Sequence, residues 1–330
     1  MSAAGGAPRG GPEDWRPTAT HAALRARAAL LARVRDFFAA RAVLEVDTPI
    51  LSAAGVSDPQ IESLMTRVGG RGGDFYLNTS PEFPMKRLLA AGSGDIYQIC
   101  RVFRDAERGR WHSPEFTLLE WYRVGFDDAA LMSEVELLIG DLLAPQRRLE
   151  AAERLSYAEA LQRHAQVDAH ASDRELDAAA ARLGIACQAD LDRDAKLDLL
   201  MGLAVGPKLG RPHPCFVCDY PASQASLARL KPGCPRVAAR FELYLDGIEL
   251  ANGFHELANP AEQRARFDRD LATRRRRGQA APPMDERLLA ALAAGLPDCS
   301  GVALGFDRLV AVALGATRLT QATAFSIDNA

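Results

Sequence analysis

Residues 100–124 are predicted to form a strand, a polar loop and a second strand, and this stretch constrains the rest of the chain most. Residues around Val102 and Phe103 favour β-structure, RDAERGRWHSPE is too polar and too rich in glycine and proline to pair, and FTLLEWY resumes the strand. The period of two places Glu120 on an otherwise apolar face with Phe116, Leu118 and Tyr122. A buried carboxylate without a partner is strongly unfavourable, so we expect Glu120 to meet a cation.

The loop between these strands carries donors suited to a phosphate chain, namely Arg104, Arg108, Arg110 and His112. Guanidinium groups present forked N–H donors that match phosphate oxygens. Phosphate donors beside an anionic pocket predict a site for ATP and an amine.

The pattern F-R-x-x-E…R-x-x-x-P-E-F-T-x-L-E-W-Y in this stretch resembles motif 2 of class II aminoacyl-tRNA synthetases in its lysyl form. It is most similar to the short lysyl paralogues that ligate (R)-β-lysine onto elongation factor P. The resemblance covers about residues 24–330. One position departs from it: the family usually has Glu two residues after the motif 2 arginine, where this chain has Ala106, followed by Glu107. We therefore expect the backbone to supply the adenine contact.

Composition is that of an ordinary globular protein, with 330 residues, 48% hydrophobic and 25% charged residues, and a net charge of −3. This charge gives no global attraction to nucleic acid, and no run of 18 apolar residues predicts a membrane span. Six cysteines in a chain of this length, without dense spacing, favour a reducing cytoplasm. Residues 1–19 are predicted to be a disordered Gly/Pro/Ala-rich tail and residues 20–330 a single catalytic domain.

Thr20 is a candidate N-cap for a helix that ends near Ala42, with Leu24, Leu31, Val34 and Phe38 on one stripe. A strand that ends before Pro49 follows. This pair is either an ordinary amphipathic helix with an edge strand or, by resemblance, the motif 1 dimer element, which implies a homodimer. Residues 127–208 are predicted to be a mainly helical insertion between motifs 2 and 3.

The segment T-S-P-E predicts a helix start, with Ser80 as N-cap, Pro81 at the first position and Glu82 in the first turn. From the pattern alone, Glu82 can simply complement the helix dipole. The resemblance instead implies that Ser80, Pro81 and Glu82 bind the amino group of the substrate. It also implies that Glu120 and Tyr122 hold the side-chain ammonium.

The stretch RFELYLDGIELANGFHEL predicts a hairpin, because Asp246 and Gly247 are typical of a type I′ turn between two alternating strands. Glu249 and Glu256 follow seven residues apart. They are either solvated or, by resemblance to E-x-x-N-G-x-x-E, Mg²⁺ ligands beside the triphosphate, with Glu256 also contacting the substrate.

The stretch CSGVALGFDRLVAVALGA predicts a strand that passes into a helix near Phe306 and places Arg308 in the first turn. A cation there is unfavourable unless an anion binds. The stretch resembles motif 3, whose arginine holds the γ-phosphate, and Ala303 stands where lysyl-tRNA synthetases generally carry Gly, which implies a preference for β-lysine. By resemblance, Arg104 and Arg308 are catalytic, and the ATP site comprises Arg104, Asp105, Ala106, His112, Ser113, Phe116, Glu249, Leu250, Gly305 and Arg308.

Two further patterns are expected to be structural and not functional. Cys215 and Cys218 have the spacing of a zinc knuckle, but no second pair follows, so we expect buried thiols and no zinc. The run of arginines at 274–277 is expected to be a solvated helix end, with docking of an acidic partner as the alternative.

The sequence as a whole predicts an α+β fold, an antiparallel β-sheet flanked by helices as in class II synthetase catalytic domains. The resemblance implies that ATP and Mg²⁺ serve to form an aminoacyl-adenylate, which an amine of elongation factor P then attacks. No anticodon-binding barrel precedes residue 20, so tRNA is not the expected acceptor. The alternatives are a truncated lysyl-tRNA synthetase and a non-catalytic regulatory paralogue, of which the latter requires decayed motifs.

Overall fold

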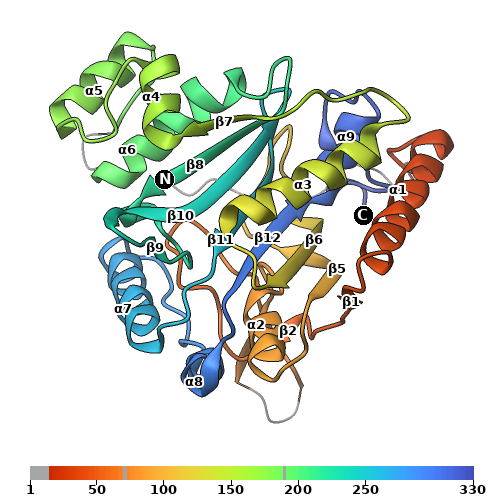
Figure 1. The fold of residues 1–330 in the computed structure, drawn as a ribbon, viewed down its shortest axis with the longest axis horizontal. Coiled ribbons are helices and arrows are strands. Elements are labelled where there is room, and N and C mark those ends of the chain that lie inside the picture. The colour runs from red at the N-terminus through yellow and green to blue at the C-terminus, as the bar shows by residue number, and fades with distance from the viewer. Residues whose placement is uncertain (1–14, 70–72, 189–190) are drawn as a thin grey trace.

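The computed structural model describes residues 15–69, 73–188 and 191–330 and has a central mixed sheet (Figure 1). The strand order is β1-β5-β6-β12-β11-β10-β8-β7. Their bounds, in that order, are Leu44–Glu45, Ile96–Phe103, Glu115–Val124, Cys299–Gly305, Ile248–His255, Cys234–Leu245, Cys215–Pro221 and Glu153–Ser156. The α+β class is confirmed. The inner strands from β5 to β8 pair antiparallel as expected, whereas the edge pairs β1–β5 and β7–β8 are parallel.

Smaller strands complete the β-structure. β9 (Leu230–Lys231) pairs with β10, and a separate three-stranded sheet has the order β2-β4-β3. Its strands are β2 (Leu51–Ser52), β4 (Asp74–Leu77) and β3 (Met65–Arg67).

Both predicted hairpin-like pairs are confirmed. β5 and β6 are antiparallel, with Gln98 opposite Glu120. β10 and β11 are joined by Asp246 and Gly247, whose φ angles of 56° and 78° are those that a type I′ turn requires. These strands bring the predicted motif residues onto one sheet.

One face of the sheet is covered by α1 (His21–Ala39), α3 (Asp128–Leu143) and α9 (Phe306–Ala313). In Figure 1, α3 runs across the front of the sheet and α1 lies along its right-hand side. Thr20 caps α1 by accepting a hydrogen bond from Ala23 N, as predicted. The predicted stripe was partly wrong: Leu30 and Phe37 are buried in place of Leu24 and Leu31, and α1 ends three residues before Ala42.

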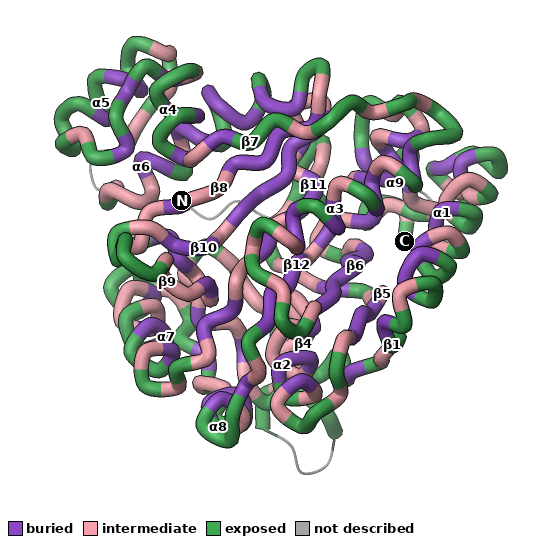
Figure 2. Tube along the Cα trace, in the orientation of Figure 1, coloured by how far each residue is buried: buried purple, intermediate pink, exposed green. Residues whose placement is uncertain are grey.

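A second group of helices lies at the lower end of the sheet in Figure 1 and consists of α2 (Glu82–Ala90), α7 (Pro260–Arg276) and α8 (Glu286–Gly295). Met85, Phe267 and Leu288 form their shared core with Ile96 and Tyr122 of the sheet. The buried stretches in Figure 2 follow the central strands, against which both of these groups of helices pack.

Three further helices pack on β8 and β10 and form a separate hydrophobic cluster: α4 (Tyr157–Ala165), α5 (Asp173–Arg182) and α6 (Arg193–Leu200). Short helical turns lie at Met201–Val205, Gly206–Lys208, Ala222–Gln224 and Leu319–Gln321. Because α3 belongs to the main core and β7 to the main sheet, we propose that the insertion expected at 127–208 is confined to residues 157–208.

Most of the predicted tail, residues 1–14, lies outside the described residues. Its last part is held against the C-terminal segment, since Thr18 N donates to Ala324 O at 2.8 Å and Thr18 Oγ1 to Thr323 O at 3.0 Å. Within the described ranges, no helix combines the length and the apolar character that crossing a membrane requires.

Candidate active site

A row of aligned residues crosses five strands on the sheet face opposite α1, α3 and α9. The register places Gln98 of β5 beside Glu120 of β6, then Ala303 of β12, Asn252 of β11 and Glu242 of β10. Four of the five side chains are polar, in contrast to the apolar residues of the adjacent row such as Leu119 and Leu304. A polar row inside a sheet indicates a ligand-binding surface.

Glu120 lies between Gln98 and Ala303 in this row and is 2% exposed. Its carboxylate accepts hydrogen bonds from Ser80 Oγ at 2.7 Å and from the Tyr122 hydroxyl at 2.8 Å. Among the described residues, no lysine, arginine or histidine forms a salt bridge with Glu120, although the Lys86 ammonium is near enough to oppose the shift in its pKa. Burial and the nearby Glu82 raise the pKa of Glu120 to about 7. A cation bound next to Glu120 would therefore stabilise its ionised form.

Lys86 links two further carboxylates of the same pocket. Its Nζ lies 2.6 Å from Glu82 Oε1 and 2.6 Å from Glu256 Oε2, and its side chain is 1% exposed. Burial raises the pKa of Glu256 to about 8, although the Lys86 ammonium opposes the shift. Ser80 Oγ also accepts from Glu82 N at 3.0 Å, and Pro81 is the residue before the first helical residue, so α2 begins one position later than predicted.

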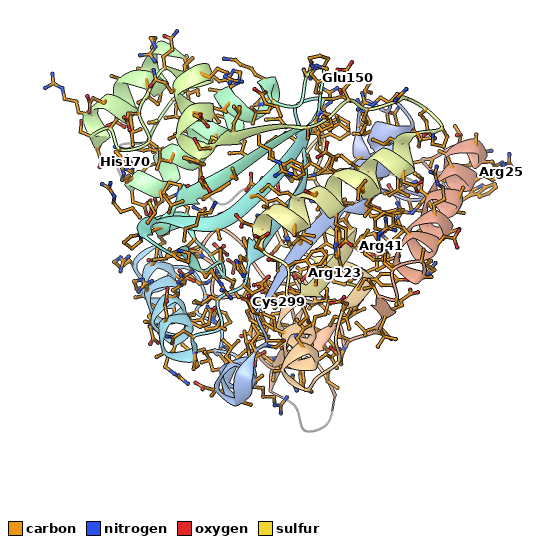
Figure 3. All side chains as sticks on the ribbon, in the orientation of Figure 1. Arg25, Arg41, Arg123, Glu150, His170 and Cys299 are labelled. Atoms are coloured by element: carbon orange, nitrogen blue, oxygen red, sulfur yellow. The ribbon has the colours of Figure 1, made fainter. Side chains whose placement is uncertain are left out.

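Gly301 allows these groups to approach one another. A Cβ atom there would lie 2.2 Å from Tyr122 Cε1 and 2.6 Å from Glu256 Oε1. The backbone amide of Glu256 donates to the carbonyl of Cys299, the residue labelled in Figure 3 at the start of β12. Any side chain at position 301 would displace Tyr122 or Glu256.

Arg104 and Arg308 lie toward the other end of this face. The guanidinium of Arg104 is 5.1 Å from the Phe116 ring centroid, and its Nε donates to Thr79 O at 3.3 Å. Arg308 donates to Trp111 O at 3.1 Å and to Glu249 O at 2.9 Å. These bonds fix both cations in front of the strands.

His112 contacts Arg308, with 2.8 Å between Nε2 and Nη2. Desolvation and the Arg308 guanidinium lower the pKa of His112. Because arginine has no acceptor, Nε2 accepts this hydrogen bond and the imidazole is neutral. Motif 2 and motif 3 residues thus meet directly.

The structure also places other residues that were predicted to bind the nucleotide. Asp105 and Ala106 lie exposed at the start of the loop, and Ala106 adopts a φ of 60°, a left-handed conformation. Gly305 is the N-cap residue of α9. A Cβ atom added at Gly305 would lie 3.5 Å from Arg308 Cδ. Leu250 points into the main core, so only its backbone is available to a ligand.

Comparisons with known proteins agree with this geometry. A family model described as tRNA synthetases class II (D, K and N) matches residues 13–329. The chain belongs to this family. It is 51% identical over 324 residues to a Vibrio cholerae protein named Elongation factor P--(R)-beta-lysine ligase, covering 96% of this chain and 99% of that protein.

Proteins with the same name are similar over comparable lengths. One from Vibrio vulnificus is 51% identical over 319 residues, covering 94% of this chain and 98% of its own. One from Salmonella paratyphi B is 50% identical over 323 residues, covering 96% and 98%. Membership of the class II synthetases implies the use of ATP.

The structure separates the two carboxylates that were expected to share Mg²⁺. Glu249 lies near the start of β11 and Glu256 directly after its end, so their Cα atoms are roughly 23 Å apart at about 3.3 Å per residue. Glu256 is already paired with Lys86, whereas Glu249 is half-exposed and lies 3.6 Å from Arg308. A single ion therefore cannot bind both, and the described residues contain no cluster of three or more His, Cys, Asp or Glu side chains suited to a metal.

Sequence reasoning missed three residues of this class II synthetase site. Lys86 carried a usable signal, since it lies one helical turn after Glu82 on an otherwise apolar face. Asn252 and Gln98 can be assigned to the site only from the register of the strands. In the described structure, Asn252 Oδ1 and Gln98 Nε2 are buried and have no hydrogen-bond partner. Unpaired buried groups beside Glu120 are suited to a polar ligand.

The cysteine pair does not form a chelating site, because its two thiols lie on opposite sides of β8. Cys215 belongs to the α4–α6 cluster, whereas Cys218 packs against the main core. Burial raises the pKa of each thiol to about 11, which lowers its reactivity.

Proposed function

We propose that this protein activates (R)-β-lysine with ATP and transfers the β-lysyl group to a lysine ε-amine of elongation factor P. The names of the relatives at about half identity over nearly the whole chain support this activity. The class II synthetase family supports a ligase that forms an aminoacyl-adenylate.

The charge balance of the buried pocket is the observation that carries the choice of substrate. Glu82, Glu120 and Glu256 contribute three carboxylates, and Lys86 is the one ammonium that pairs with any of them among the described residues. When all three carboxylates are ionised, their negative charge exceeds the single positive charge of Lys86 by two. A diamino acid such as β-lysine brings two ammonium groups, which would neutralise the pocket on binding.

The remaining geometry suits adenylate formation without an enzyme nucleophile. The substrate carboxylate attacks the α-phosphorus of ATP, the bond to the β-phosphate oxygen breaks, and pyrophosphate leaves. Arg104 and Arg308 would offset the negative charge that develops on the phosphoryl oxygens. The acceptor amine then attacks the acyl carbon, AMP leaves with the bonding electrons, and the amine loses a proton to solvent.

Mg²⁺, when bound, would supply positive charge that offsets the negative charge of the triphosphate. We propose Glu249 as its protein ligand, because its carboxylate is half-exposed and faces Arg308. Neighbouring Glu242 uses its two oxygens for Arg240 and the Tyr244 hydroxyl, at 2.6 Å each. Glu256, which is paired with Lys86, would contact the substrate and not the metal.

We further propose a cytoplasmic homodimer that does not use tRNA as its acceptor. Leu44, Ile50 and Leu51 follow α1 and are exposed by 56%, 39% and 42%, which suits a contact with a second copy of the motif 1 element. All six cysteines are free, as expected in a reducing compartment.

Amino-acid-dependent exchange of pyrophosphate into ATP tests the first step, with (R)-β-lysine and α-lysine compared. Intact-mass analysis of elongation factor P after incubation with enzyme, ATP and β-lysine tests the second. Acylation of tRNA instead would favour the truncated lysyl-tRNA synthetase. Absence of exchange with either amino acid would favour the regulatory paralogue.

A further inference from the structure

Arg274 differs from the rest of the arginine run at the end of α7. Arg275, Arg276 and Arg277 are exposed, as predicted for a solvated helix end, whereas Arg274 is 1% exposed. A buried guanidinium is unfavourable unless its donors are satisfied. The expectation of a uniformly solvated run was therefore wrong at its first residue.

All three nitrogens of Arg274 donate hydrogen bonds to irregular backbone or to a carboxylate. Nε donates to Ala280 O at 2.5 Å, Nη1 to Asp58 O at 2.9 Å and to Ile61 O at 3.0 Å, and Nη2 to Glu62 Oε2 at 2.6 Å. Three of these four acceptors belong to the segment 57–62, which we call the strap.

The strap contains no helix or strand, and most of its hydrogen bonds to the rest of the described structure involve α7 and the turn after it. Gln60 also donates to Asp198 Oδ2 of α6 at 3.4 Å. Besides the contacts to Arg274, Ser57 Oγ donates to Asp270 Oδ2 at 3.1 Å, and Gln279 Nε2 donates to Pro59 O at 3.0 Å. The guanidinium of Arg274 contacts more strap residues than either of these side chains.

The strap also touches the motif 2 loop. The amide of Asp105 donates to Glu62 O at 2.8 Å, so Glu62 binds Arg274 through its carboxylate and Asp105 through its carbonyl. Asp105 directly follows Arg104, and its carboxylate accepts from Ala106 N at 2.7 Å, where the backbone takes its left-handed turn. The start of the nucleotide loop is thereby anchored to α7.

We propose that Arg274 is a positioning residue for the nucleotide site, acting through Glu62 on Asp105 and hence on Arg104. The inference rests on the proposed ATP-dependent activity. Arg274 touches no substrate; it holds the strap at the position from which Glu62 O can accept the Asp105 amide. Lysine is a poor replacement, because one ammonium cannot reach acceptors spread around a planar guanidinium.

The test compares Arg274→Lys, Glu62→Gln and the matched control Arg275→Lys in pyrophosphate exchange, with KM measured separately for ATP and for β-lysine. Arg274→Lys and Glu62→Gln each weaken the charge-assisted hydrogen bond between Arg274 and Glu62. We therefore expect the KM for ATP to rise about tenfold in both variants. We expect the KM for β-lysine to stay within about twofold and Arg275→Lys to match the wild type.

A merely structural role would give a different pattern. A lower Tm in Arg274→Lys with an unchanged KM for ATP, or equal changes in both KM values, would overturn the inference. Glu62→Gln keeps the test decisive if Arg274→Lys does not fold, because Glu62 is partly exposed and its amide substitute keeps the same shape. Failure of the proposed function is distinguishable, since it would abolish exchange in the wild type itself.

Discussion

Lys86 Nζ lies 2.6 Å from Glu256 Oε2 in a pocket where both side chains are 1% exposed. The same ammonium contacts Glu82 at 2.6 Å and is the one cation paired with the pocket carboxylates in the described structure. It lowers the charge of the pocket without neutralising it. The pocket is therefore pre-organised for a ligand that supplies the missing positive charge.

Lys86→Met is expected to destabilise the protein by about 3–5 kcal/mol, because it leaves Glu256 buried without its partner. The loss is measured by urea unfolding. The double variant Lys86→Met with Glu256→Gln is the control, and it should recover most of the stability since it removes both charges. A double variant as unstable as the single one would show that Lys86 acts through packing alone.

The stability of the ligand-free protein is expected to fall as the pH rises from about 5 to about 8. The folded-state pKa values of Glu120, about 7, and Glu256, about 8, both lie above the ordinary value of 4.5, so the folded state binds protons more tightly than the unfolded chain. Their contribution is complete below the unfolded-state pKa and is lost as the pH passes through the folded-state values.

A ligand with two ammonium groups reverses this loss, because the ammonium groups pair with the ionised carboxylates. The increase in Tm caused by saturating β-lysine should therefore be larger at pH 8 than at pH 6, as differential scanning fluorimetry can measure. Glu120→Gln should flatten this difference. An increase that is independent of pH would place the ammonium groups of the ligand away from Glu120 and Glu256.

Glu120→Gln is expected to raise the KM for β-lysine by about two orders of magnitude, as for the loss of one buried charge-assisted contact. The KM for ATP should remain nearly unchanged, because the Ser80 and Tyr122 hydroxyls contact Glu120 and not the nucleotide loop. Steady-state pyrophosphate exchange measures both constants. Parallel rises in the two would contradict the assignment of Glu120 to the amino acid.

Arg308→Ala is expected to slow pyrophosphate exchange by about a hundredfold, since a cation held against phosphate in a dry site is worth about 3 kcal/mol. Three protein acceptors, Trp111 O, Glu249 O and His112 Nε2, hold the guanidinium in place. Arg101→Ala is the matched control, because Arg101 is exposed and pairs with Glu115. Wild-type exchange in Arg308→Ala would remove this arginine from the ATP site.

The sequence predicted the strands and the hairpin well because their signals are local. Alternation defined β6, and Asp246-Gly247 specified a type I′ turn whatever the rest of the chain does. Edge pairing carries no such signal: whether β1 lies parallel to β5 depends on where distant helices direct the chain. The parallel edge pairs were not predicted for that reason.

The same distinction separates the site residues that were predicted from those that were missed. Glu120 and Arg308 were conspicuous because each violates a local rule, a carboxylate on an apolar face and a cation at a helix start. Gln98 and Asn252 violate nothing locally and join the site only through register across β5, β6, β12 and β11. Arg274 was misjudged because its burial is created by the strap, more than 200 residues earlier in the chain.

Ala303→Gly is expected to shift the preference between lysine isomers toward α-lysine. Ala303 lies between Asn252 and Glu120 in the row that crosses the sheet, so its methyl group forms part of the pocket floor. A methyl-sized change in pocket shape is worth about 1–3 kcal/mol, so kcat/KM for α-lysine relative to β-lysine should improve about tenfold or more. Ala251→Gly is the control, because it weakens the adjacent strand but removes its methyl from the main core on the opposite face. An unchanged isomer ratio in Ala303→Gly, or an equal shift in both variants, would make Ala303 a packing residue and leave the choice of isomer to the placement of Glu82 and Glu256.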